Sequence, residues 1–240
     1  MPTTKPAPRS LLVLRCLTAL IGCAGLAWGV LNVARGEVAD DFRELESRLL
    51  QFETFNQTTA ASALAGALAW DVSRCDNHAQ RALLLLEIPL ADAALRSGAA
   101  RDYDARVRSL ETRARAALSC TPRDSFIWLV LFGLEAGHGV LDDRAFDLLA
   151  MSYETSPNEA WIAIRRITLA IPIVLSAPEP LQQRILGEFQ DLVKNGFIEL
   201  PARAYSRASG PTRALLQSRI EQLDASRQKA FSEALRTPHT

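Results

Sequence analysis

Histidine and cysteine are the side chains through which this sequence could carry metal or redox chemistry, and both are rare. The three histidines are His78, His138 and His239, and no pair has the spacing of metal ligands. His138 with Asp142 and Asp143 offers too few ligands, so we interpret that segment as a solvated turn. No Cys-x-x-Cys pair, Gly-x-Ser-x-Gly elbow, Walker loop or Rossmann glycine pattern occurs. We therefore expect no metal, no cofactor and no enzymatic activity.

The four cysteines fall into two groups. Cys16 and Cys23 belong to an apolar N-terminal stretch, and Cys75 and Cys120 lie in the remaining part of the chain. Two cysteines in an exported domain predict one disulfide, which would close a loop of about 45 residues. The alternative is that Cys75 and Cys120 are two unrelated buried thiols.

The N-terminal stretch has the length of a membrane span. Cys16–Ala34 carries no charge, and with Leu11–Leu14 the apolar stretch reaches about 23 residues, broken only by Arg15. Arg15 can reach the headgroups, and Trp28 suits the opposite interface. We predict a transmembrane helix at 11–34 after a short basic tail at 1–10. A cleaved signal peptide and a lipoprotein signal acylated at Cys23 are the alternatives.

Charge gives the orientation of this segment and limits the partners. Basic residues flank the stretch on both sides, but no acid precedes it, which favours an N-terminus inside the cell. Residues 36–240 carry 23 basic and 27 acidic residues, a net charge of −4, which argues against nucleic acid as a partner. We expect a single-pass protein of the bacterial inner membrane with its soluble domain in the periplasm.

The segment after the stretch, residues 36–57, predicts a juxtamembrane amphipathic helix. Its apolar residues recur at steps of four and three: Val38, Phe42, Leu45, Leu49 and Phe52. Such a stripe either packs on the rest of the same chain or forms a homodimer through residues 38–52.

Residues 58–240 show helical periodicity and few strand signals, so we predict an all-α domain. Pro89 is expected to kink or split one of the helices, and Gly196 to end another. The expected helices begin with the ranges 58–70, 77–97, 102–119, 124–136 and 141–154, and shorter helices follow.

One phrase occurs twice in this domain, as TPRDSFIW at 121–128 and as SPNEAWIA at 156–163, with the prolines 35 positions apart. Two helices per 35 residues, with a proline at each restart, resemble the tetratricopeptide repeat, whose unit is 34 residues. The resemblance covers about 101–171 and implies a solenoid of α-helical hairpins. Helical hairpins without repeat identity are the alternative.

We expect each proline of the phrase in the first turn of a helix, with Asp124 and Asn158 as caps. The aromatic residues Phe126, Trp128 and Trp161 are expected to reach a core shared by the two hairpins.

The resemblance also implies a binding surface. In tetratricopeptide proteins the first helix of each repeat lines a groove for partner peptides, which would place Trp161 and Arg165 there, with the arginine binding a carboxylate. Alternatively, Trp161 lies in the core, and Arg165 and Arg166 pair with surface acids. We expect a non-enzymatic scaffold that docks another protein of the cell envelope. The alternative is an accessory component of an envelope pathway such as surface polysaccharide assembly or export.

Overall fold

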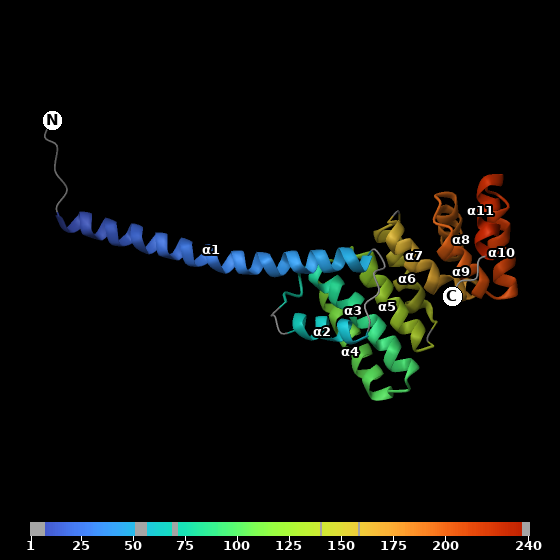
Figure 1. Ribbon diagram of the computed structural model, residues 1–240, viewed down its shortest axis with the longest axis horizontal. Helices are drawn as coiled ribbons and strands as arrows, with labels where there is room; N and C mark the ends of the chain where they lie inside the picture. The colour runs from blue at the N-terminus through green and yellow to red at the C-terminus, as the bar shows by residue number, and fades with distance from the viewer. Residues whose placement is uncertain (1–7, 51–56, 69–71, 140, 158, 237–240) are drawn as a thin grey trace.

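The computed structural model describes residues 8–50, 57–68, 72–139, 141–157 and 159–236. Over these ranges the chain forms eleven α-helices, one 3-10 helix and no strand, so the predicted all-α class is confirmed. Figure 1 shows one long helix projecting from a compact bundle that holds all the others.

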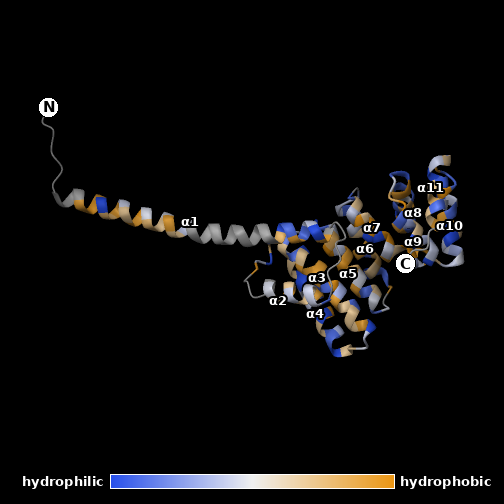
Figure 2. Ribbon diagram, viewed as in Figure 1, coloured by the Kyte–Doolittle hydropathy of each residue, from blue (hydrophilic) through white to orange (hydrophobic). Residues whose placement is uncertain are grey.

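The projecting helix, α1 (Pro8–Leu50), has 43 residues, which corresponds to about 64 Å. Its segment Leu12–Gly29 is long and apolar enough to cross a membrane, and none of its residues is buried. Figure 2 shows this segment as mostly hydrophobic, in contrast to the end of α1 beside the bundle. The predicted transmembrane and juxtamembrane helices therefore form one helix, without a break at Gly36.

The end of α1 nearest the bundle packs on α3 (Asn77–Arg96). Phe42 and Leu49 are buried there and Leu45 is half-buried. These three residues of the apolar stripe thus pack on their own chain, and a homodimer through residues 38–52 stays a prediction. The side chains of Val38 and Phe52 lie outside the described residues.

The first part of the bundle is built around α3, which contacts α1, α2 (Gln57–Leu68) and α4 (Ala100–Leu118). Leu83–Leu86 are buried, as expected for core and not for a second membrane span. Pro89 lies on the exposed side of α3, and the helix continues through it, so the expected split does not occur.

The second part of the bundle runs from α5 to the last helix in Figure 1. α5 (Ser125–Gly137) pairs with α6 (Asp143–Thr155), and α7 (Ala160–Ala170) contacts both α5 and α8 (Glu179–Lys194). The short 3-10 helix η1 (Ile171–Ser176) joins α7 to α8, and Gly196 follows α8 with a φ of 92°. The remaining helices are α9 (Glu199–Arg207), α10 (Gly210–Ile220) and α11 (Ala225–Arg236).

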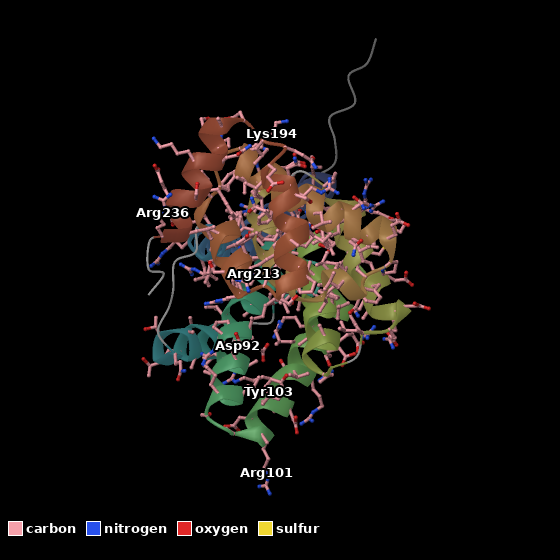
Figure 3. All side chains as sticks on the ribbon, turned by 90° about the vertical axis from the view of Figure 1, so that its right-hand side faces the viewer. Asp92, Arg101, Tyr103, Lys194, Arg213 and Arg236 are labelled. Atoms are coloured by element: carbon pink, nitrogen blue, oxygen red, sulfur yellow. A yellow bond between two sulfur atoms is a disulfide. The ribbon has the colours of Figure 1, made fainter. Side chains whose placement is uncertain are left out.

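One continuous core joins these parts, from Phe42 on α1 to Phe231 on α11. Figure 3 looks onto the end formed by α8, α10 and α11, where Lys194, Arg213 and Arg236 point outwards.

Both copies of the repeated phrase lead into the start of a helix, α5 in the first and α7 in the second. Pro122 and Pro157 each lie in a turn, three residues before the first helical residue, so the expected first-turn position is wrong. The reason is that the acid two residues after each proline takes the N-cap position. Asp124 accepts hydrogen bonds from the backbone N–H groups of Phe126 and Ile127, at 3.1 and 3.3 Å.

In the second copy, the N-cap residue is Glu159, whose carboxylate accepts from the indole Nε1 of Trp161 at 3.0 Å. Asn158, the cap expected from the sequence, lies outside the described residues.

The aromatic residues of the two copies also meet. Phe126 and Trp161 occupy the same position of the phrase, and their ring centres are 5.6 Å apart. Phe126 is buried as expected, whereas Trp161 and Trp128 are only half-buried. The indole of Trp128 points back to its own turn and donates to the carbonyl oxygen of Pro122 at 2.8 Å. The two copies are therefore in contact through equivalent residues of α5 and α7.

Candidate functional site: an interhelical clamp and an open groove

A disulfide joins Cys75 to Cys120, as the sequence predicts, with Cα atoms 5.2 Å apart. Cys75 lies just before α3, and Cys120 lies between α4 and α5. The bond therefore ties the start of α3 to the turn that leads into α5. Cys16 and Cys23 are free and exposed on α1.

Two carboxylates are bridged by Arg81 close to this disulfide. Its Nε donates to Asp124 Oδ2 at 2.8 Å, and its Nη1 donates to Glu46 Oε1 at 3.2 Å. Both carboxylate side chains are at most 5% exposed. Glu46 also pairs with Nδ1 of His78. Arg81 thereby connects α1, α3 and the N-terminus of α5 through charged hydrogen bonds.

Burial and the opposite charges within this bridge shift the pKa values of Arg81 and Asp124. Burial alone would lower the pKa of Arg81, but the carboxylates of Asp124 and Glu46 raise it above its ordinary value. Burial raises the pKa of Asp124, although Arg81 and the backbone N–H groups of α5 oppose that shift.

Arg165 and Trp161 complete the contact with α1. Arg165 donates to the carbonyl oxygen of Trp161 and to that of Leu49, both at 3.1 Å. The guanidinium carbons of Arg165 and Arg81 lie 5.4 and 5.8 Å from the centre of the Trp161 ring. Burial lowers the pKa of Arg165 to about 10, so the group remains charged at neutral pH.

We name this set the α1 clamp, because its members hold the end of α1 against the bundle: Glu46, His78, Arg81, Asp124, Trp161 and Arg165. The structure thus brings the predicted residues Trp161 and Arg165 together, and the bonds described for them lie within the chain. Their binding of a partner stays a prediction.

A second charged cluster, which the sequence analysis did not predict, lies behind α7. Arg166 is fully buried and pairs with Glu188. Its Nη1 donates to the carbonyl oxygen of Ser152 at 2.7 Å, and its guanidinium lies 4.2 Å from the ring centre of Tyr153. The Tyr153 hydroxyl donates to Glu188 Oε2 at 2.9 Å. Burial raises the pKa of Glu188, and the bonds from Arg166 oppose the shift.

A sequence signal for this burial exists. Arg166 has the helical phase of Ile162, Ala163 and Ala170, which are all buried on α7. An arginine at a core position requires a buried acid as partner.

An open groove of about 1010 Å³ lies beside this ion pair, between α6, α7 and α8. Tyr153 and Glu188 contribute to its lining, and Glu154 and Arg184 lie 3.8 Å apart on one side. Phe197, which follows α8, also lines the groove and is 43% exposed.

The two histidines that the structure describes lie on different elements. His78 belongs to the α1 clamp, His138 ends α5, and His239 lies outside the described residues. Within the described ranges, no three His, Cys, Asp or Glu side chains gather in a way that could hold a metal ion.

Comparison with protein-family models, with curated proteins and with solved structures finds no match to this chain. The class defined by the fold is an all-α protein with one N-terminal helix able to span a membrane. The predicted solenoid of tetratricopeptide-like hairpins is not confirmed by these comparisons and stays a prediction.

Proposed function

We propose that this protein is a single-pass, membrane-anchored helical scaffold that docks a partner protein of the cell envelope and has no enzymatic activity. The observation that carries the proposal is the construction of α1. Its distal part is apolar and exposed, and its proximal end is built into the bundle through the α1 clamp.

The exposure of α1 supports insertion into a bilayer. Leu20, Leu26 and Trp28 are 68%, 73% and 71% exposed, and all the side chains from 12 to 28 are exposed. In water, a continuous apolar surface of this length is unfavourable, at about 25 cal/mol for each Å². A bilayer removes that cost, because the segment matches the thickness of its hydrocarbon core.

The bundle would then lie close to the membrane surface. If the span ends at Ala34, Phe42 lies eight residues further along α1, which corresponds to a rise of about 12 Å, and Phe42 is buried in the bundle. The disulfide between Cys75 and Cys120 supports an oxidising compartment, hence a periplasmic bundle with the N-terminus inside.

Two measurements test the anchor. We expect the intact mass of protein purified from membranes to correspond to an uncleaved, unlipidated chain. A mature chain that starts near Arg35, or at a lipidated Cys23, would overturn the anchor. We also expect protease added outside the inner membrane to digest the bundle.

Photocrosslinking in native membranes tests the scaffold. A photoreactive amino acid is placed at Leu95, Leu175 or Phe197, which are exposed at separate places on the bundle. A scaffold gives a discrete adduct with another envelope protein from at least one of these positions. If none of them yields an adduct, the scaffold proposal is wrong.

A further inference from the structure

We propose that the groove between α6, α7 and α8 binds a basic segment of the partner protein, one that also carries an apolar side chain. This inference rests on the proposed scaffold function and adds the docking site and the chemistry of the bound segment.

The two helices α7 and α8 line the groove with small residues, which leave space for a ligand. α7 presents Ala160 and Ala163 to it, and α8 presents Gly187. A Cβ atom added at Gly187 would meet no atom within 4 Å. Glycine in a helix interior is unfavourable by about 0.5–1 kcal/mol relative to alanine. Neither a tight turn nor packing within the chain accounts for glycine here, whereas access to the backbone of α8 does.

The charges around the groove select a basic occupant. Three carboxylates line it, from Glu154, Glu188 and Asp191, against the single cation of Arg184. Glu188 is already bonded to Arg166 and Tyr153, so it forms a fixed, buried part of the site.

Asp191 is the carboxylate that remains for a ligand. It is exposed and lies on α8 one turn beyond Glu188, on the same side of the helix. Within the described ranges, its carboxylate forms no hydrogen bond and no ion pair. A lysine or arginine entering the groove would pair with it, whereas an acidic segment would be repelled.

Apolar surface lies next to these charges. Phe197 is 43% exposed, and Leu192 and Pro157 line the groove as well. An apolar side chain of the ligand can cover the Phe197 ring while a basic side chain reaches Asp191. The combination favours a peptide segment over a small ion, because both kinds of surface are used together.

The test measures peptide binding to the full chain in nanodiscs of zwitterionic lipid, by fluorescence anisotropy. The probe is a labelled ten-residue peptide with three lysines and two leucines among glycine and serine. A matched peptide has glutamates in place of the lysines. We expect the lysine peptide to bind in a salt-sensitive way and the glutamate peptide not to bind. Equal binding of the two peptides would overturn the proposal.

Three variants locate the binding. Gly187→Leu fills the groove and should weaken the lysine peptide at least about tenfold, whereas Asp191→Asn should weaken it about two- to fivefold, the range for one exposed ion pair. The matched control is Asp92→Asn, an exposed aspartate at the end of α3, which Figure 3 labels well away from Lys194 on α8. Asp92→Asn should bind like the wild type. Wild-type affinity in both groove variants would overturn the proposal.

Folding is checked by circular dichroism. Leucine is a better helix former than glycine and meets no atom at Cβ, so we expect Gly187→Leu to fold. If Gly187→Leu does not fold, the proposal is still tested by the affinity of Asp191→Asn and by the comparison of the lysine peptide with the glutamate peptide.

The crosslinking experiment separates this inference from the function on which it rests. If the probe at position 197 gives an adduct and Gly187→Leu abolishes that adduct, the result supports the scaffold function and the groove as its docking site. An adduct from Leu95 or Leu175 alone keeps the scaffold and overturns the groove as its docking site.

Discussion

Arg165 on α7 donates a hydrogen bond to the main-chain carbonyl oxygen of Leu49, 3.1 Å away and 116 residues earlier in the chain. Leu49 lies in the last turn of α1 that the structure describes. A guanidinium there supplies a donor and places positive charge at the negative end of the helix dipole. The contact therefore stabilises the end of α1 on the bundle.

We expect Arg165→Met to loosen this end of α1. Loss of a hydrogen bond from a charged group costs about 1.5–3 kcal/mol, and the effect should be local. Hydrogen exchange of residues 45–49 should become faster by about tenfold or more, while α5 and α6 keep their protection. The control is Arg144→Met, because Arg144 is exposed and lies 3.8 Å from Glu135. Unchanged exchange at residues 45–49 would show that Arg165 does not hold α1.

Arg166→Met should be far more destabilising than any surface arginine variant. It leaves the carboxylate of Glu188 buried without its cation, which costs about 3–5 kcal/mol. Arg184→Met is the matched control, since its partner Glu154 is 3.8 Å away and both side chains are about half exposed. That change should cost less than about 1 kcal/mol. Chemical unfolding of the full chain in nanodiscs measures both, and similar losses would contradict the buried pair.

Glu87 should make the stability of the bundle depend on pH. Burial raises its pKa, although Ser109 and Arg113 oppose the shift. Because the folded pKa lies above the unfolded value, the stability contributed is fully present below the ordinary carboxyl pKa of 4.5 and is lost as pH rises through the folded pKa. Glu87→Gln should therefore melt at a higher temperature than the wild type at pH 7, and the difference should shrink towards pH 4.

The control for this pH dependence is Glu111→Gln, at a half-buried residue of α4 that pairs with Arg115. A wild type that gains stability over Glu87→Gln as the pH rises from 4 to 7 would reverse the expected sign.

Reduction of the disulfide should destabilise the bundle by about 4 kcal/mol, the entropic estimate for a loop of 45 residues. Cys75→Ser with Cys120→Ser should lose the same amount and then be insensitive to reductant. The loss should be largest around the α1 clamp, because the bond fixes the segments that carry Arg81 and Asp124. Non-reducing peptide mapping checks the bond, and two freely alkylated thiols in protein from its native compartment would reject it.

Much of the fold could be predicted because it depends on short sequence patterns within each helix. The helices of the bundle follow apolar periodicity, and they begin and end near the expected places, as at the N-cap Asp124 before α5 and at Gly196 after α8. The disulfide was predictable because only two cysteines lie outside the apolar stretch. The repeated phrase also predicted a contact, which Phe126 and Trp161 make.

The charged clusters could not be predicted, because their partners come from distant segments. Arg81 bonds to Glu46 and Asp124, which are 35 and 43 residues away, and nothing local selects those acids. Arg165 shows the same limit: its position on α7 suggested a groove, but its described bonds lie within the chain and reach α1. The groove that does form depends on how α7 and α8 pack.

Because α1 is unbroken, its length determines how the bundle is rotated about the helix axis. Each residue of an α-helix turns the chain by about 100°, so the number of residues between the membrane and Phe42 determines which side of the bundle faces a neighbouring membrane protein. One alanine inserted in that stretch would swing the groove by about 100° around the helix axis and lift it by only about 1.5 Å. Four inserted alanines would bring it back to within about 40° of its original direction. A partner fixed in the same membrane would therefore tolerate four extra residues better than one or two.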